Sequence, residues 1–261
     1  MLSERLVYAL LAILLSFSFL EQTILIQCLT DYLGKPATQA IMFQDTMDDP
    51  NLIVVAFRGT HPFDPEDWRT DVDLSWFELE GVGKIHSGFM KALGLQKDKG
   101  WPKEIEQGNN QRQFAYYEIR QRLRDLLQKN EKAKFIVTGH SLGAALAILF
   151  LTVLAKHEEE WLMDKLEGVY TFGQPRVGDS QMGDYMKKKL KQYNVRYLRF
   201  VYCNDIVPRI PFDDETQFFT HFGPCLYYNS FYKGKVSALS LFKHVEFLNF
   251  RFGTMTLHYA S

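Results

Sequence analysis

The chain has 261 residues, 46% of them hydrophobic, and a formal net charge of −1 at pH 7. This length and apolar content are enough for one enzyme-sized domain with a substantial core, and the balanced charge gives no basic field for nucleic acid. The three cysteines, Cys28, Cys203 and Cys225, are too few and too scattered for a disulfide framework or a C-x-x-C metal site, which favours a reducing compartment.

A nearly uncharged apolar run occupies residues 6–20, preceded by Arg5. The run is short for a membrane-spanning helix. It fits a retained anchor or a helix lying on lipid, a signal peptide cleaved near Ser16 or Ser18, or a helix buried in the core. Residues 1–22 are therefore an anchor or signal-like segment, and residues 23–261 are expected to form a single domain. An anchor predicts an intracellular protein at a membrane or lipid-droplet surface, whereas a signal peptide predicts secretion.

Three elements are expected between residues 22 and 57. Residues 22–33 fit a helix and residues 40–43 a strand. Residues 52–57 form a continuous apolar run of strand length, which is typical of a central strand covered on both faces. This strand ends abruptly at residues 58–60.

The polar segment at residues 61–74 contains two prolines and one large aromatic side chain, Trp68. It fits a mobile cover over an apolar pocket, and it fits equally an ordinary surface loop packed down by Trp68. His86 follows beside small residues and is expected to be structural rather than catalytic.

Strands and helices alternate in the second half of the chain. Apolar side chains recur at spacings of three and four between residues 111 and 130, which predicts an amphipathic helix. A further helix is expected at 179–192, with Lys187, Lys188, Lys189 and Lys191 on its solvated face, and strands are expected at 135–138, 169–172 and 195–203. The alternation predicts an α/β fold, in which a mostly parallel sheet is flanked by helices on both faces.

The sequence Gly-His-Ser-Leu-Gly at residues 139–143 joins an expected strand to an alanine-rich helix. A glycine two positions on either side of Ser141 allows a sharp strand-to-helix turn, which exposes the hydroxyl at a helix N-terminus. Backbone N–H groups and the helix dipole stabilise an oxyanion at such a place. Ser141 is therefore the candidate nucleophile, and the alternative is a serine that caps a buried helix.

Ligands of such sheets bind beyond the carboxyl ends of the strands. Asp205 comes directly after the expected 195–203 strand and is well placed to orient a histidine that serves Ser141. The alternative is that Asn204 and Asp205 form a turn or a helix cap.

Four motifs lie at residues 57–60, 139–145, 172–179 and 204–208. Taken together, they resemble the class 3 lipase family, and their residues are most like those of the plant branch that includes oil-body triacylglycerol lipases. The resemblance covers about residues 38–236. It implies an α/β-hydrolase fold with Ser141 as the nucleophile and Asp205 as the triad acid.

The same resemblance implies further roles. Thr60 and the backbone N–H of Leu142 would form the oxyanion hole. Residues 61–73, with Trp68, match the position of the family's lid, and residues 173–179 match a structural loop.

The sequence leaves open which histidine is the third member of the triad. In the family a histidine follows a hairpin, which here spans residues 218–232, but after residue 236 the sequence departs from the family. His258 suits the family's order and position, whereas His244 falls on the polar face of an expected helix. The triad is completed by His258, by His244, or by no histidine of this chain. His140 stands next to the nucleophile and His221 in an expected strand, so neither is a candidate base.

These features predict a serine esterase or lipase that hydrolyses carboxylic ester bonds of lipids, with triacylglycerol favoured, through an acyl-enzyme. The alternatives are a phospholipid or galactolipid acyl hydrolase, an acyltransferase, and a catalytically impaired or truncated protein that binds lipid without turnover. The expected partners are a lipid ester and a lipid-droplet or membrane surface. No cofactor or metal is expected, since His157 and Glu158 lack the second histidine of a zinc-hydrolase motif. The oligomeric state stays open.

Overall fold

The computed structural model describes residues 23–30, 36–44, 51–59, 75–95, 100–105, 114–211, 219–230 and 234–237. Several predicted features lie outside these residues, namely the apolar run at 6–20, Thr60, the loop with Trp68, His244 and His258. Their roles, and the division of the chain at residue 22, stay predictions.

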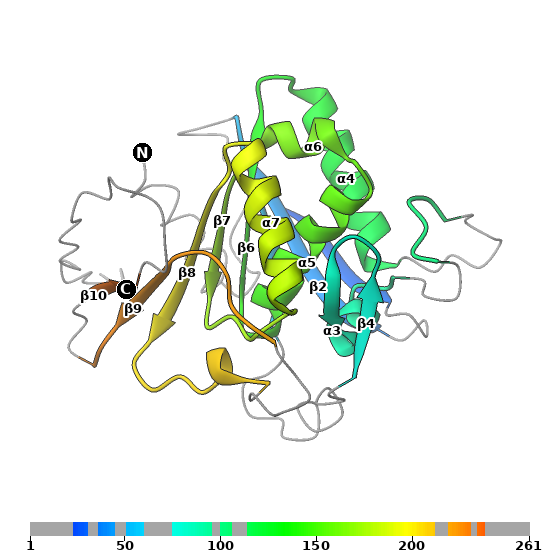
Figure 1. Cartoon of the computed structure of the whole chain (residues 1–261). Coiled ribbons are helices and arrows are strands. Elements are labelled where there is room, and N and C mark those ends of the chain that lie inside the picture. The colour runs from blue at the N-terminus through cyan, green and yellow to red at the C-terminus, as the bar shows by residue number, and fades with distance from the viewer. Residues whose placement is uncertain are drawn as a thin grey trace, which may run out of the picture.

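An eight-stranded sheet forms the centre of the described chain (Figure 1). Its strands are, in spatial order, β1 (Thr23–Thr30), β2 (Pro36–Gln44), β3 (Leu52–Phe57), β6 (Lys134–His140), β7 (Leu166–Phe172), β8 (Arg196–Tyr202), β9 (Cys225–Tyr228) and β10 (Gly234–Ser237). The strands from β3 to β9 run parallel. Antiparallel strands β2 and β10 pair with the two sides of this group, and β1 pairs antiparallel with β2. The prediction of a mostly parallel sheet is confirmed.

Helices connect the parallel strands. They are α4 (Ala115–Lys129) before β6, α5 (Leu142–Lys156) and α6 (Glu160–Lys165) between β6 and β7, and α7 (Ser180–Gln192) between β7 and β8. A small sheet of β4 (Trp76–Leu79) and β5 (Gly83–His86) precedes the short helix α3 (Ser87–Ala92), and the 3-10 turn η2 (Val207–Arg209) follows β8.

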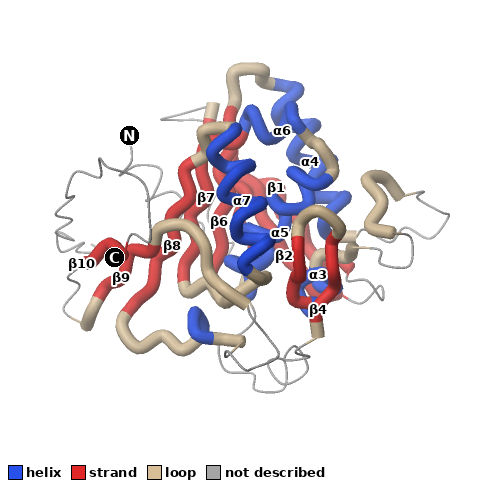
Figure 2. Tube along the Cα trace, viewed as in Figure 1, coloured by secondary structure: helices blue, strands red, loops and turns tan. Residues whose placement is uncertain are grey.

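Buried side chains form two clusters, which the sheet separates. Along β3, Ile53, Val55 and Phe57 belong to the first cluster, and Leu52, Val54 and Ala56 belong to the second. This alternation follows from the two-residue repeat of a strand. The described helices contribute buried side chains to the first cluster alone, and Figure 2 shows α4 to α7 gathered on one side of the sheet. The described helices therefore cover one face rather than the two expected.

The predicted helix at residues 22–33 is wrong. Strand β1 pairs antiparallel with β2, from Thr23 opposite Phe43 to Thr30 opposite Pro36. A short apolar run has the same pattern in a strand and in a buried helix. Here several β-branched residues favour the strand, and β2 supplies the hydrogen-bonding partner.

The C-terminal hairpin also differs from the prediction. It is formed by β9 and β10, with Cys225 opposite Ser237, and so lies further along the chain than residues 218–232. His221 precedes β9 rather than lying in a strand. Gly223, at a φ of 73°, interrupts the extended chain between His221 and β9.

Helix α7 has the predicted amphipathic form. Met182, Met186 and Leu190 are buried, while Lys187 is exposed and pairs with Asp184 at 3.0 Å. The prediction that its lysines lie on a solvated face is confirmed.

Within the described ranges, no helix combines the length and the apolar character needed to cross a membrane.

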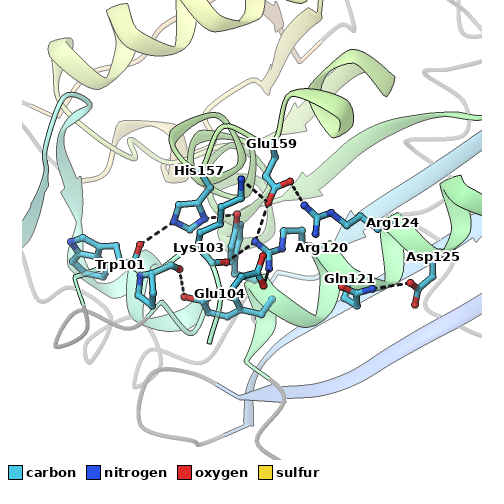
Figure 3. Close-up of polar contacts among 12 residues, drawn as sticks. Trp101, Lys103, Glu104, Arg120, Gln121, Arg124, Asp125, His157 and Glu159 are labelled. Atoms are coloured by element: carbon cyan, nitrogen blue, oxygen red, sulfur yellow. Dashed lines mark hydrogen bonds and ion pairs between the residues drawn. The ribbon is translucent and has the colours of Figure 1, made fainter. Parts of the chain in front are cut away.

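Residues 101–105, which we call the strap, lie against α4 and the turn between α5 and α6 (Figure 3). The Tyr117 hydroxyl donates to the Pro102 carbonyl at 2.8 Å, and Arg120 Nη1 donates to the Lys103 carbonyl at 2.6 Å. The strap has no regular secondary structure, and these contacts hold it in place because side chains of α4 donate to its backbone carbonyls.

Glu159 is the centre of the charges beneath the strap (Figure 3). Its side chain is only 5% exposed, and one carboxylate oxygen accepts from Arg120 at 3.1 Å while the other pairs with Arg124. Arg120 is itself 2% exposed and also pairs with Glu104, which is 66% exposed. Buried charges of both signs thus neutralise each other.

His157 connects the strap to α4. Its Nε2 lies 3.0 Å from the Trp101 carbonyl oxygen and its Nδ1 lies 2.8 Å from the Tyr116 hydroxyl. Since a carbonyl only accepts, Nε2 carries the proton of the neutral ring and Nδ1 accepts from Tyr116. Burial lowers the pKa of His157, which keeps the ring in this neutral form.

Candidate active site

Ser141 stands at the junction of β6 and α5, in a backbone conformation that few residues adopt. Its φ is 54° and its ψ is −125°, a region that costs on the order of 1–3 kcal/mol for a residue other than glycine. The Ser141 N–H donates to the Phe172 carbonyl at 3.0 Å, and the side chain makes no capping hydrogen bond to α5. The serine therefore does not act as an ordinary helix cap.

Glycines allow the backbone to close around this turn. A Cβ built on Gly139 would lie 2.2 Å from the carbonyl oxygen of Gly143. A Cβ built on Gly143 would lie 2.2 Å from the carbonyl oxygen of Phe57, at the end of β3. Both contacts are with backbone atoms that cannot rotate away, so the spacing in the motif reflects close packing of β3, β6 and α5.

Leu142 is the first residue of α5. The first N–H groups of a helix have no partner within the helix, and the positive end of the helix dipole lies there. On the other side, Gly59 approaches the turn so closely that a Cβ on it would lie 2.7 Å from the His140 carbonyl oxygen and 3.5 Å from Ser141 Cβ. The chain thus passes the serine just before Thr60, which lies beyond the described residues.

Asp205 follows β8 in the sequence. Strand β8 ends at the same edge of the sheet as the parallel strands β6 and β7 (Figure 1). The backbone N–H of Asp205 donates to the Tyr202 carbonyl at 3.0 Å, and its Oδ1 accepts from the Val207 N–H at 3.0 Å. The carboxylate therefore does stabilise a turn, which was the alternative to a catalytic role for Asp205. Only Oδ1 is used in this way, and Oδ2 is directed toward Gly173, the residue after β7.

The four described histidines have different environments. His86 is buried, accepts from the Gly88 N–H at 3.2 Å as the cap of α3, and stacks on Phe89, so the expectation of a structural role is confirmed. His157 belongs to the strap contacts, and His221 Nε2 lies 2.7 Å from the Pro208 carbonyl oxygen.

His140 directly precedes Ser141 and, like Asp205, lies against Gly173. The histidine is exposed, yet the groups packed around it withdraw enough water to lower its pKa, against the opposing effect of the Asp205 charge. Within the described residues, no group of three potential metal ligands stands close together.

Sequence reasoning missed Gly173 as part of this site. The residue has a φ of 54°, and a Cβ on it would lie 2.7 Å from Asp205 Oδ2 and 3.4 Å from His140 Nε2. A glycine directly after an apolar strand was the available signal, but its neighbours come from two other strand ends.

The parallel sheet, the connecting helices and the strained serine turn define an α/β-hydrolase. A solved structure, lipase II from Rhizopus niveus, has the same fold, with a TM-score of 0.61 and 24% sequence identity over 83% of this chain and 71% of that one. Residues 54–215 match the family described as lipase (class 3), and the chain belongs to this family.

Two plant relatives are more similar in sequence. Triacylglycerol lipase OBL1 of Arabidopsis thaliana is 48% identical over 223 residues, which cover 79% of this chain and 43% of the relative. Triacylglycerol lipase OBL1 of Nicotiana tabacum is 39% identical over 262 residues, covering 78% and 46% respectively. The chain thus spans less than half the length of these relatives.

Proposed function

We propose that the protein hydrolyses carboxylic esters of lipids, triacylglycerols foremost, through an acyl-enzyme on Ser141. The observation that carries the proposal is the backbone of Ser141, which is strained, packed between glycines and placed at the start of α5 without capping it. Strain of this kind persists where the surrounding structure maintains it, and such positions cluster at active sites. Membership of the class 3 lipase family and the names of the two plant relatives favour a triacylglycerol.

The reaction proceeds in two steps, acylation of Ser141 and hydrolysis of the acyl-enzyme. Ser141 Oγ attacks the ester carbonyl carbon while a histidine, for which His258 is the candidate, takes the hydroxyl proton. The N–H of Leu142 and Thr60 stabilise the oxyanion. When the ester C–O bond breaks, the same proton passes to the leaving alcohol. Water then attacks the acyl-enzyme, gives a proton to the histidine, and releases the fatty acid as the serine recovers its proton. Asp205 orients the histidine throughout.

Fluorophosphonate labelling tests this proposal without requiring the right lipid. Wild type is expected to label rapidly and Ser141→Ala not at all. Asp205→Asn is expected to label on the order of ten-thousand-fold more slowly, and His258→Ala on the order of a million-fold more slowly. Wild-type labelling that survives Ser141→Ala would refute the nucleophile. Slow wild-type labelling that is indifferent to His258→Ala would favour the impaired, lipid-binding alternative.

The substrate class is tested by product analysis. Triolein, phosphatidylcholine and a galactolipid are offered as separate emulsions, with Ser141→Ala as the blank. The proposal expects the fastest release of fatty acid from triolein. Faster release from either polar lipid would replace the triacylglycerol assignment with the corresponding acyl hydrolase, and new esters formed on adding an alcohol would indicate acyl transfer.

We also propose that the protein works at a lipid-droplet or membrane surface. The apolar run at residues 6–20 supports this, as do the exposed side chains of Tyr202 and Ile206, which flank Asp205 in the sequence. Flotation with triolein emulsions, comparing the whole chain with a variant that lacks residues 1–22, tests the anchor. Equal flotation of the two proteins would eliminate it.

A further inference from the structure

Gly173 occupies the point where three strand ends meet. It follows β7, and its N–H donates to the Phe200 carbonyl of β8 at 2.9 Å, which fixes its position in the sheet. In the space beside its Cα, where any other residue would carry a Cβ, the nearest atoms to that Cβ position are Oδ2 of Asp205 at 2.7 Å and Nε2 of His140 at 3.4 Å. We call this space the notch.

Asp205 is held through one carboxylate oxygen and through its own backbone. Oδ1 accepts from the Val207 N–H at 3.0 Å, and the backbone N–H of Asp205 is tied to the Tyr202 carbonyl. With the main chain and Oδ1 fixed in this way, the carboxyl group can still tilt. The position of Oδ2 therefore depends on the atoms that Oδ2 contacts. Oδ2 is also the oxygen that the Val207 N–H leaves free to accept from a catalytic base.

We propose that Gly173 is a positioning residue for catalysis, because its missing side chain provides the notch in which Oδ2 of Asp205 rests beside His140. The inference rests on the proposed function, in which Asp205 orients the base of Ser141. A Cβ at 2.7 Å from an oxygen is closer than real Cβ contacts, so any other residue would push the carboxylate away. Misplacing a catalytic group by about 1 Å costs up to about a hundred-fold in rate.

Backbone strain is a separate effect and has its own control. Gly173 has a φ of 54°, so a larger residue there is strained whatever the space. Gly100 has a φ of 69°, but a Cβ built on it would meet no atom of the described residues within 4 Å. Gly100→Ala therefore reproduces the strain without the contact. Asn adopts positive φ more readily than Ala, so Gly173→Asn and Gly100→Asn form a second matched pair in case Gly173→Ala does not fold.

The experiment measures fluorophosphonate labelling per folded molecule, with the folded fraction taken from circular dichroism at the same temperature. Gly173→Ala or Gly173→Asn is expected to label about ten- to a hundred-fold more slowly than wild type, and the Gly100 variants at the wild-type rate. A second arm places Gly173→Ala in the Asp205→Asn background. Since Gly173 acts through the carboxylate, the double variant is expected to label within about two-fold of Asp205→Asn alone.

Two results would overturn the inference. One is a wild-type labelling rate per folded molecule in either Gly173 variant. The other is an equal loss from Gly173→Ala in the presence and absence of the Asp205 carboxylate, which would indicate a general distortion of the site. Failure of the proposed function looks different, since wild type itself would then not label, or would label as fast as Ser141→Ala.

Discussion

Replacing Glu159 by glutamine tests how much the charges beneath the strap stabilise the fold. The substitution keeps the shape of the side chain but removes the charge that faces Arg120 and Arg124. Arg120 would remain 2% exposed, with the largely exposed Glu104 as its remaining carboxylate partner. Removing one partner of a buried pair costs about 3–5 kcal/mol. Because Glu104 stays in place, we expect the lower end, about 3 kcal/mol of unfolding free energy.

Urea denaturation followed by tryptophan fluorescence measures this free energy, and a thermal melt should fall by about 6–12 °C. The matched control is Arg122→Ala, which breaks the surface pair between Arg122 and Glu118, since an exposed pair contributes about 0.5 kcal/mol or less. A loss from Glu159→Gln no larger than that from the control would refute the reasoning. Labelling per folded molecule should stay at the wild-type rate, because the length of α5, about 20 Å, separates Glu159 from Ser141.

Three further outcomes follow from the strained turn and the strap. Ser141→Gly is expected to unfold at higher urea than Ser141→Ala, because glycine adopts positive φ without strain; equal midpoints would contradict this. Gly143→Ala places a Cβ 2.2 Å from the Phe57 carbonyl oxygen and is expected to lose about 3 kcal/mol of stability in urea titration together with labelling; retention of both would be inconsistent with the observed packing. The lowered pKa of His157 means that its contribution is complete above about pH 6.5 and is lost as the pH falls through the lowered value. The difference in urea midpoint between wild type and His157→Asn should therefore shrink on acidification, and a constant difference would exclude this role.

The turn around Ser141 is predictable from the sequence because its determinants are consecutive. The glycines, the apolar strand before them and the alanine-rich helix after them all lie within residues 135–155, and the structure places a strand, a strained turn and a helix there. The position of Asp205 directly after a strand is predictable for a similar reason, since a strand end is a local feature.

What the sequence does not reveal depends on pairing across the sheet. The notch at Gly173 exists because β7 lies between β6 and β8, which brings His140 and Asp205 to the same glycine from distant parts of the chain. The sequence of strand β1 fits a helix as well as a strand, and the ambiguity ends only when β2 lies beside it. The Arg120 and Glu159 pair joins α4 to the turn after α5, and no spacing in the sequence indicates it.

The burial of helix α5 indicates which parts of the described chain should unfold locally and which should not. Every residue from Leu142 to Ala155 is buried, so the amide protons that are hydrogen-bonded within the helix should exchange with deuterium only through global unfolding. The exposed turn after β8, which includes Asn204 and Ile206, is expected to exchange through smaller local openings. The serine is thus mounted on a part of the described chain that we expect to exchange slowly, so we expect any adjustment that admits a bulky ester to come from the segments around it rather than from the helix that carries the nucleophile.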